Sequence, residues 1–355
     1  MVLIVALLAV AASASAIALL PSEGSSDEPQ PVASPTTTTI SPATSSTAVT
    51  ATTTTAIAPA VESVTFLAAG DIGGHENPAG DVLRAMAVPQ SDFFLILGDL
   101  SYEEIVPATA WCDWVQGFFP TDYPIEIVVG NHEDDKRANG FIREFTPCMP
   151  DRMDATGDYG VEYYFDTGPV RVIMVGADVS VDGVSYDYGI PGPRRDWLLA
   201  RVDEAEAAGL WTVVGMHKVC VTTGSKGCEI GESTIDGLIA HGADLILHGH
   251  EHNYQRSHQL HCVDVDTTTP ACIADTDSRH QAGQGAVIVG AGWVGRTAYE
   301  VSGTDSEAGY FAVIGGPNLP GWAPGYLTVS ATETTLSARW TSIGGGNTDA
   351  FTITR

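Results

Sequence analysis

The chain has 355 residues, of which 44 are acidic and 16 are basic, and its formal net charge is −28. A chain this acidic repels polyanions, so the composition excludes a protein that coats bulk DNA or RNA. Apolar residues make up 44 % and charged residues 17 %. This is enough to build a large core and excludes a wholly disordered chain.

The N-terminal residues differ in composition from the rest of the chain. Residues 1–20 are uncharged and begin with an apolar run, which predicts a cleaved export segment. An uncleaved anchor is the alternative, because about 20 apolar residues can span a bilayer. Residues 21–61 are rich in Ser, Thr, Ala and Pro and predict a disordered linker or tether to a membrane or cell wall. We expect a secreted or extracytoplasmic protein, with surface anchoring as the alternative, and one folded domain in residues 62–355.

The six cysteines are even in number, and export would place them in an oxidising compartment, so disulfides are expected. Six cysteines allow 15 pairings. Pairing of neighbours in the sequence is favoured, and buried free thiols are the alternative. No CxxC spacing is present, which argues against a zinc knuckle or a thioredoxin-like site. The favoured pairs are Cys112 with Cys148, Cys220 with Cys228, and Cys262 with Cys272.

Five short apolar segments predict strands, and each is followed by side chains that can bind a metal. The strand segments are residues 64–69, 93–97, 125–129, 211–216 and 245–247. Between them, residues 79–88 and 193–208 predict helices, the second with Pro193 in its first turn and Gly209 at its end. Strand and helix alternate in the βαβ pattern.

Beyond Gly285 the helical pattern ends and short alternating segments predict strands again. The predicted fold is therefore α/β, a layered α-β-β-α sandwich of two mixed sheets flanked by helices. In such a fold the loops at the carboxyl ends of the strands carry the functional residues. The C-terminal strand segments are residues 286–290, 326–330, 335–340 and 351–354.

Each polar turn taken singly has an ordinary structural explanation. An Asp or Asn after a strand is more often a turn or helix-capping residue than a metal ligand, and single histidines are common at strand ends. The order of five such turns carries more information. They read Gly70-Asp71-Ile72-Gly73, Gly98-Asp99-Leu100-Ser101-Tyr102, Gly130-Asn131-His132-Glu133, Val214-Gly215-Met216-His217 and Gly249-His250-Glu251-His252.

This ordered set resembles the motifs GDxG, GDxxY, GNHE, VxxH and GHxH of the calcineurin-like metallophosphoesterases, and within them of the purple acid phosphatases. The resemblance spans nearly all of the predicted domain. It implies a trivalent iron bound by Asp71, Asp99, Tyr102 and His252. It implies a second ion, Fe²⁺, Zn²⁺ or Mn²⁺, bound by Asp99, Asn131, His217 and His250.

The chemistry of the residues agrees with this resemblance. Carboxylate and phenolate oxygens suit a trivalent ion, and imidazoles with an amide oxygen suit a divalent one. Two ions about 3.5–4 Å apart can activate water and hold the phosphoryl oxygens during in-line attack. The resemblance also implies that His132 binds phosphate and protonates the leaving alcohol.

Five nearby residues have weaker support. For Glu133 and Arg256 a structural role is at least as well supported as a role in the site. His75 and His248 are expected to be incidental, and Lys218 is expected to be surface-exposed rather than a phosphate-binding residue.

The resulting hypothesis is an exported metal-dependent phosphoesterase, an acid phosphatase that hydrolyses small phosphomonoesters. The alternatives are a phosphodiesterase or nucleotidase with the same site, and a non-catalytic surface binding module.

Overall fold

The structure is a computed structural model that describes residues 63–75 and 78–355. The predicted export segment and the predicted linker lie outside the described residues. Within those two ranges, no helix has both the length and the apolar character that crossing a membrane requires.

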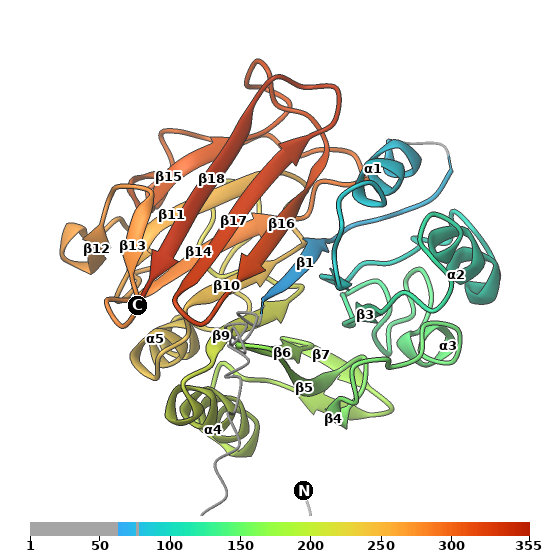
Figure 1. Ribbon diagram of the computed structural model, residues 1–355, viewed down its shortest axis with the longest axis horizontal. Helices are drawn as coiled ribbons and strands as arrows, with labels where there is room; N and C mark the ends of the chain where they lie inside the picture. The colour runs from blue at the N-terminus through green and yellow to red at the C-terminus, as the bar shows by residue number, and fades with distance from the viewer. Residues whose placement is uncertain (1–62, 76–77) are drawn as a thin grey trace, which may run out of the picture. The chain divides into compact units, whose positions relative to one another are not determined.

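One mixed sheet has seven strands in the order β13-β18-β17-β16-β1-β2-β3. Its parallel part is built from alternating strands and helices: β1 (Val64–Ala69), α1 (Ala79–Met86), β2 (Phe93–Ile96), α2 (Ala108–Gln116) and β3 (Ile125–Ile127). The C-terminal strands extend the sheet antiparallel from β1, and β13 closes the edge (Figure 1). The antiparallel strands are β16 (Gly325–Ala331), β17 (Thr335–Ser342) and β18 (Thr348–Thr354), and β13 (Arg279–Gln281) pairs parallel with β18.

The other large sheet has nine strands in the order β12-β11-β14-β10-β9-β6-β5-β4, with β15 paired to β11. Its parallel part contains β6 (Val170–Val175), α4 (Pro193–Ala208), β9 (Trp211–Met216), α5 (Glu232–Ala240), β10 (Leu245–His248) and β14 (Ala286–Ala291). The remaining strands are β4 (Thr156–Asp158), β5 (Glu162–Thr167), β11 (Tyr254–Leu260), β12 (Ile273–Asp275) and β15 (Phe311–Gly315). A short helix and a hairpin complete the connections, α3 (Ile142–Phe145), β7 (Val179–Val181) and β8 (Val184–Tyr186).

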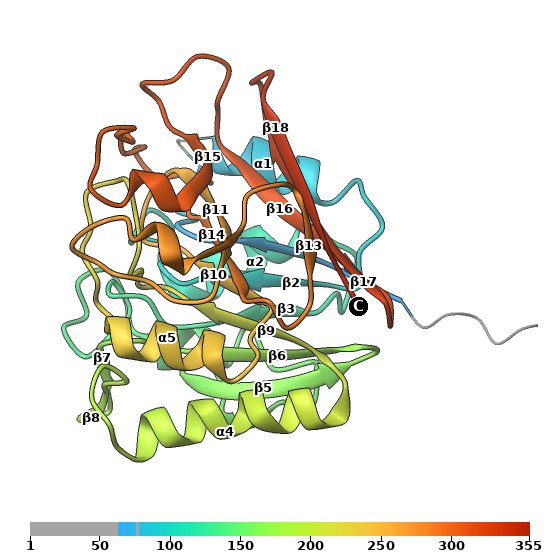
Figure 2. The same ribbon diagram turned by 90° about the vertical axis from the view of Figure 1, so that its left-hand side faces the viewer.

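Large side chains join the two sheets. Tyr254 of β11 stacks on Trp340 of β17 with ring centroids 4.5 Å apart, and the buried Arg256 forms an ion pair with Asp349 of β18. Figure 2 shows α4 and α5 on the outer side of the second sheet, next to β5, β6 and β9. The predicted α/β fold of two mixed sheets with flanking helices is therefore confirmed.

The predicted elements agree with the structure and differ mainly at their ends. Helix α4 starts at Pro193 and stops at Gly209, whose φ of 70° places it in the left-handed region that glycine favours. Strand β3 ends at Ile127, two residues earlier than expected, because the N–H of Val129 donates to the carbonyl of Gly160 instead of continuing the ladder. The chain thus leaves the sheet just before the Gly130 turn.

The structure confirms all three favoured disulfides, Cys112–Cys148, Cys220–Cys228 and Cys262–Cys272. The Cys112–Cys148 bond connects α2 to the loop after α3. The Cys220–Cys228 bond closes a loop that follows β9, on the side where strands β9 and β10 end.

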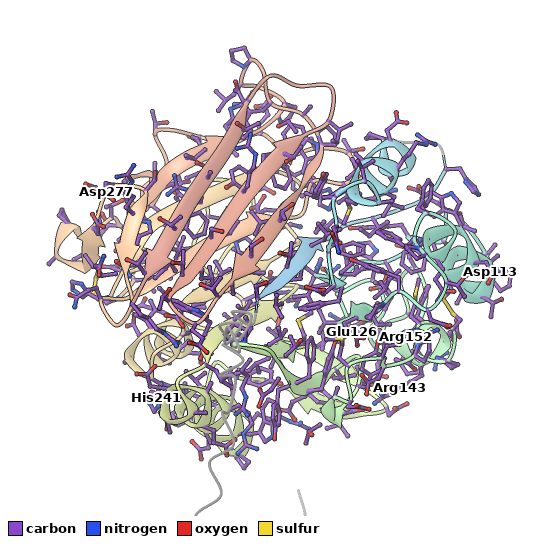
Figure 3. All side chains as sticks on the ribbon, in the orientation of Figure 1. Asp113, Glu126, Arg143, Arg152, His241 and Asp277 are labelled. Atoms are coloured by element: carbon purple, nitrogen blue, oxygen red, sulfur yellow. A yellow bond between two sulfur atoms is a disulfide. The ribbon has the colours of Figure 1, made fainter. Side chains whose placement is uncertain are left out.

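One carboxyl group lies in the core away from these loops. Glu126 of β3 is fully buried and accepts a hydrogen bond from the backbone N–H of Arg152 at 3.1 Å, and Figure 3 shows the two residues next to each other. Burial raises the pKa of Glu126 to about 7, because the apolar surroundings disfavour the charged form.

Candidate metal centre

Seven candidate ligands come together at the carboxyl ends of β1, β2, β3, β9 and β10. Six of them are less than 10 % exposed, and Asn131 is partly exposed. Polar side chains this deeply buried need partners, and the contacts described below connect them in two groups. The seven residues are Asp71, Asp99, Tyr102, Asn131, His217, His250 and His252.

The first group consists of Asp71, Tyr102 and His252. The Tyr102 hydroxyl lies 2.8 Å from Asp71 Oδ1, and His252 Nε2 lies 3.2 Å from the same carboxylate oxygen. The Tyr102 hydroxyl and His252 Nε2 are themselves 3.2 Å apart. Two oxygens and one nitrogen therefore converge on one point.

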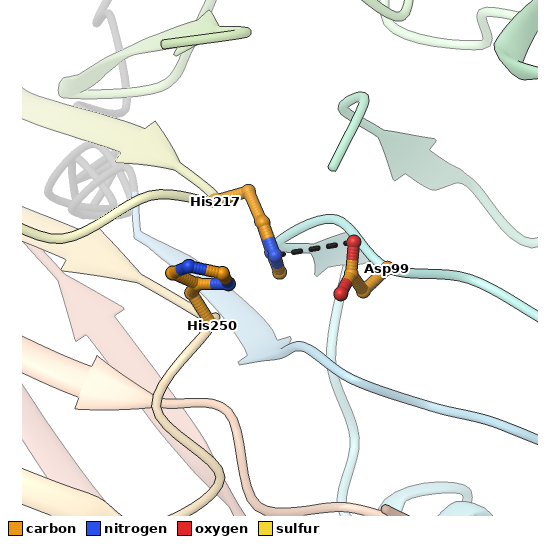
Figure 4. Close-up of side chains that lie close together, drawn as sticks. All are labelled: Asp99, His217 and His250. Atoms are coloured by element: carbon orange, nitrogen blue, oxygen red, sulfur yellow. Dashed lines mark ion pairs between the residues drawn. The ribbon is translucent and has the colours of Figure 1, made fainter. Parts of the chain in front are cut away.

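The second group consists of Asn131, His217 and His250. His217 Nε2 lies 3.2 Å from Asn131 Oδ1, and the rings of His217 and His250 are 4.8 Å apart. Potential ligand atoms of Asp99, His217 and His250 all lie within 4.8 Å of one another, and Figure 4 shows the three side chains turned toward a common space.

Asp99 lies between the two groups. Its Oδ2 is 2.7 Å from the Tyr102 hydroxyl, and its Oδ1 is 3.1 Å from His217 Nε2. Each oxygen of this one carboxylate thus faces a different group, which is the arrangement needed to bridge two cations.

The backbone around these side chains adopts conformations that non-glycine residues rarely use. Asp71, Asp99, Tyr102 and His250 all have positive φ, between 50° and 66°. Such conformations cost energy and cluster at functional sites. Gly130 is required by contact rather than by φ, because a Cβ at this position would lie 2.0 Å from Asp99 Oδ1.

Two of the histidines are oriented by backbone carbonyls. His217 Nδ1 lies 2.8 Å from the carbonyl of Leu97, and His252 Nδ1 lies 2.8 Å from the carbonyl of Thr297. A carbonyl oxygen can only accept, so Nδ1 carries the proton and Nε2 is left as the ligand atom. His250 is held differently, since its Nε2 lies 2.9 Å from Glu229 Oε2.

The pKa values of Tyr102 and His217 are both raised when no cation is bound. Burial and the charges of Asp71 and Asp99 raise the pKa of Tyr102 well above its usual value. Burial lowers the pKa of His217, but the nearby charges of Asp99 and Asp71 outweigh it and raise that pKa to about 9. A bound cation relieves both conditions, because it stabilises carboxylates and phenolate and is ligated by neutral imidazole.

The candidate catalytic residue His132 is 28 % exposed and lies beside this group. Its backbone N–H donates to Asp99 Oδ1 at 3.1 Å, and its ring is 4.4 Å from the ring of Tyr102. Its Nδ1 contacts Asn139 Oδ1, while its Nε2 is 3.6 Å from Asp99 Oδ2. The ring is therefore fixed on one side and directed toward the candidate ligands on the other.

Glu133 and Arg256 have structural contacts, consistent with the structural role weighed for them. The carboxylate of Glu133 accepts N–H groups from Leu100 and Gly130 and so connects two of the site loops. Arg256 pairs with Asp349 between the sheets. His75 packs against Trp114, and burial lowers the pKa of His248 to about 4, so His248 is a neutral core residue.

The expectation for Lys218 is wrong. Its side chain is 6 % exposed, and its Nζ is 2.6 Å from Asp178 Oδ2 and 3.7 Å from Glu229 Oε1. Asp178 and Glu229, the residue directly after Cys228, supply the carboxylates that balance the charge of the buried lysine.

Four residues at the site carry no signal in the sequence, namely Asn139, Glu229, Arg296 and Tyr299. The Arg296 guanidinium lies 4.1 Å from the centroid of the Tyr102 ring, and Tyr299 stacks on His252 at 4.2 Å. These residues belong to loops without a motif, so only the folded chain places them at the site.

The donor set fits two metal ions. It combines two carboxylates, a phenol, an amide oxygen and three imidazoles, which are the ligands of iron, zinc and manganese. Three observations agree with this fit. Any side chain at position 130 would crowd Asp99, the two Asp99 oxygens face different groups, and backbone carbonyls orient His217 and His252.

Comparison with known proteins supports the same family. The chain is 32 % identical over 219 residues to an uncharacterized protein of Mycobacterium tuberculosis, covering 56 % of this chain and 41 % of that one. It is 23 % identical over 241 residues to purple acid phosphatase 15 of Arabidopsis thaliana, covering 59 % of this chain and 43 % of that one. The chain thus spans less than half the length of these two relatives.

Solved structures show the same fold. The structure of a purple acid phosphatase from seeds of yellow lupin (Lupinus luteus) matches with a TM-score of 0.64 at 15 % identity, over 83 % of this chain and 54 % of that chain. The family model for calcineurin-like phosphoesterases matches residues 64–254, the region that supplies all seven candidate ligands. The chain belongs to the calcineurin-like phosphoesterase family.

Proposed function

We propose that this protein is an exported phosphoesterase with a binuclear metal site and that it acts as an acid phosphatase on small phosphomonoesters. The observation that carries the proposal is the position of Asp99, whose two carboxylate oxygens face two separate sets of ligand atoms at 2.7 and 3.1 Å. A site for one ion would not need a carboxylate divided in this way.

Each set suits a different ion. Asp71, Tyr102 and His252 would hold Fe³⁺, because a phenolate and carboxylates are hard, negatively charged ligands. Asn131, His217 and His250 would hold a divalent ion, Fe²⁺, Zn²⁺ or Mn²⁺, and Asp99 would be shared. Two such ions supply an activated water and a clamp on the phosphoryl oxygens.

His132 is the residue of this chain that would protonate the leaving alcohol. Its Nδ1 is held by Asn139, its Nε2 faces the candidate ligands, and part of the ring reaches solvent. A proton on Nε2 can pass to the departing alkoxide oxygen, and the resulting neutral ring can regain a proton from water.

Export is supported by composition and by the cysteines. All six cysteines are in disulfides, and such bonds persist in oxidising compartments outside the cytoplasm. We therefore place the protein outside the cytoplasm, either released or attached through its N-terminal residues. The small phosphate ester is its proposed partner, and bulk nucleic acid is not.

The first test measures metal content and turnover together. The purified wild-type chain should contain two metal ions and hydrolyse p-nitrophenyl phosphate, and the variant Asp99→Asn should lose turnover by at least about 100-fold, since even partners of metal ligands cost 10- to 100-fold when removed. The variant Asp113→Asn is the matched control, because Asp113 is exposed on α2 away from the site and should not change the rate.

Two outcomes would favour the alternatives. Faster turnover of bis(p-nitrophenyl) phosphate than of the monoester would favour a phosphodiesterase with the same site. Two bound metal ions without hydrolysis of any phosphate ester would contradict an enzymatic role and favour a surface binding module.

A further inference from the structure

The loop between β9 and α5 carries a carboxylate that contacts the metal centre. The loop is closed by the Cys220–Cys228 disulfide, and Glu229 follows the second cysteine directly. Glu229 Oε2 lies 2.9 Å from His250 Nε2. No motif includes Glu229, and the hydrolytic role proposed above does not use it.

His250 differs from the other two site histidines in how its ring is held. His217 and His252 each place Nδ1 on a backbone carbonyl and leave Nε2 free to bind a cation. His250 has Glu229 at Nε2, so Nδ1 is the nitrogen left for the cation. One ring nitrogen of His250 is on the side of His217 in Figure 4 and the other is on the far side.

The His250 side chain is 8 % exposed, so a protein group rather than bulk water is the main partner of its second ring nitrogen. An imidazole with no partner on its second nitrogen could carry its proton on either nitrogen, and one of the two forms would block the ligand atom. The negative charge of a carboxylate next to Nε2 favours the form with the proton on Nε2 and leaves Nδ1 unprotonated.

Glu229 is itself held by the backbone of its loop and by Lys218. Its backbone N–H donates to the carbonyl of Val219 at 2.9 Å, across the base of the disulfide-closed loop. Its Oε1 lies 3.7 Å from Lys218 Nζ, and this buried lysine also contacts the backbone carbonyl of Asp178 at 2.8 Å and its carboxylate at 2.6 Å. Lys218 thus partly balances the charge on Glu229, and Glu229 keeps its contact with His250.

We propose that Glu229 is a positioning residue of the metal centre, which fixes the orientation and protonation of the His250 ring so that Nδ1 binds the divalent ion. The proposal rests on the binuclear site proposed above. The disulfide-closed loop and Lys218 hold Glu229 in place, so the loop supports a metal ligand that lies on a different strand end. Partners of this kind change metal affinity by about 10- to 100-fold when they are removed.

The test compares zinc binding of the metal-free chain and three variants in zinc-buffered solutions, read as zinc ions bound per chain. In Glu229→Ala the affinity at the His250 position should fall by about 10- to 100-fold, so one of the two zinc ions is lost at concentrations that saturate the wild type. Glu229→Gln keeps an acceptor for Nε2–H and should recover most of the affinity. Asp178→Asn is the matched control, since it removes the other carboxylate partner of Lys218 and leaves Glu229 in contact with His250.

A second measurement reads the ring directly and needs no metal. Nitrogen-15 NMR of the metal-free chain, with His250 assigned by the variant His250→Gln, should show the proton on Nε2 in the wild type and a mixture of the two forms in Glu229→Ala. Circular dichroism of each variant checks that the fold is retained.

The outcomes separate this role from the proposed function. A wild type that binds two zinc ions and a Glu229→Ala variant with unchanged affinity and an unchanged ring would overturn the role of Glu229 alone. A wild type that cannot bind two ions would overturn the binuclear site and this role with it. Equal loss in Asp178→Asn and Glu229→Ala would also overturn the role, because it would show that the lysine pair matters and the His250 contact does not.

Discussion

The protonation state of Tyr102 depends on a bound cation. Its hydroxyl is buried within 2.8 Å of two carboxylates, and burial together with their charges raises its pKa well above the usual value. Without a cation it remains a phenol that donates to a carboxylate. With Fe³⁺ in the first group it would be a phenolate, and ligation by phenolate gives ferric centres their visible colour in the purple acid phosphatases that this chain resembles.

The variant Tyr102→Phe tests this assignment. The iron-loaded wild type should be coloured, and the variant should lose its visible absorption band, because phenylalanine has no oxygen to bind the ion. Turnover of p-nitrophenyl phosphate should fall by about 10- to 100-fold or more, since loss of a ligand costs at least as much as loss of a partner behind a ligand. Absorption spectra and iron content of the purified proteins are the measurements.

Tyr299 provides the matched control. It stacks on His252 at 4.2 Å and belongs to no predicted ligand set. The variant Tyr299→Phe should keep both the ring contact and the absorption band. A band that persists in Tyr102→Phe and disappears in Tyr299→Phe would reverse the assignment.

At the level of elements, the site depends on loops that leave parallel strands in unusual conformations. The loop after β3 passes so close to the loop after β2 that a methyl group at Gly130 would lie 2.0 Å from Asp99 Oδ1. Glu133 connects the same two loops through the N–H groups of Leu100 and Gly130. The shared carboxylate is therefore positioned by how these two loops pack.

The variant Gly130→Ala should disrupt this packing. Overpacking of a tight contact costs about 1–3 kcal/mol of unfolding free energy, and the displaced Asp99 should lower metal content as well. Gly346→Ala is the control, because a methyl group there meets no atom within 4 Å. Urea unfolding and metal analysis are the measurements, and a Gly130→Ala chain that keeps wild-type metal content would contradict the contact.

The strands that lead into the candidate site, and most of the site itself, could be predicted because local pattern and motif coincide there. Segments such as β1 and β9 are apolar runs that end in a turn with a glycine or a ligand, so a short stretch of sequence determines both. Strand β6 is one of several strands that were not predicted. It carries Arg171 among apolar residues, and that charge is compensated by Asp166 and Glu204, which only the fold brings near.

The rest of the site could not be predicted because loop conformation decides it. Glu229 and Asn139 reach the site through loops whose path depends on a disulfide and on long-range hydrogen bonds. Lys218 was expected at the surface because its burial also depends on partners that only the folded loops bring near. A lysine next to a strand end is usually solvated, and here Asp178 and Glu229 make its burial tolerable.

At the scale of the whole molecule, stability should depend on pH through the net charge and through three buried groups. The net charge of −28 favours compact folding at acidic pH, where repulsion between carboxylates is smaller. Burial raises the pKa of Glu126 and of Asp244 to about 7, which acts in the same direction. His248 acts in the opposite direction, since burial lowers its pKa to about 4 and the unfolded chain takes up a proton there below pH 6.5.

A single substitution can isolate one of these contributions. Asp244 is buried, and its Oδ2 accepts a hydrogen bond from the N–H of Thr212 at 2.9 Å. Its folded pKa is about 7 and its ordinary value is 3.8. Between these pH values the unfolded chain loses the proton and the folded chain keeps it, so the wild type loses stability as pH rises through this window and levels off above it.

Asp244→Asn removes this titration and keeps an oxygen for the N–H of Thr212. The free energy of unfolding of the variant, relative to that of the wild type, should therefore rise by about 2–4 kcal/mol from pH 4 to pH 8, at about 1.4 kcal/mol for each unit of pKa difference. Urea unfolding of both chains without metal, at constant ionic strength, measures this difference. A constant difference across the pH range would show that Asp244 is ionised in the folded chain, and a difference that falls with pH would show that Arg355, whose charge lowers this pKa, outweighs burial.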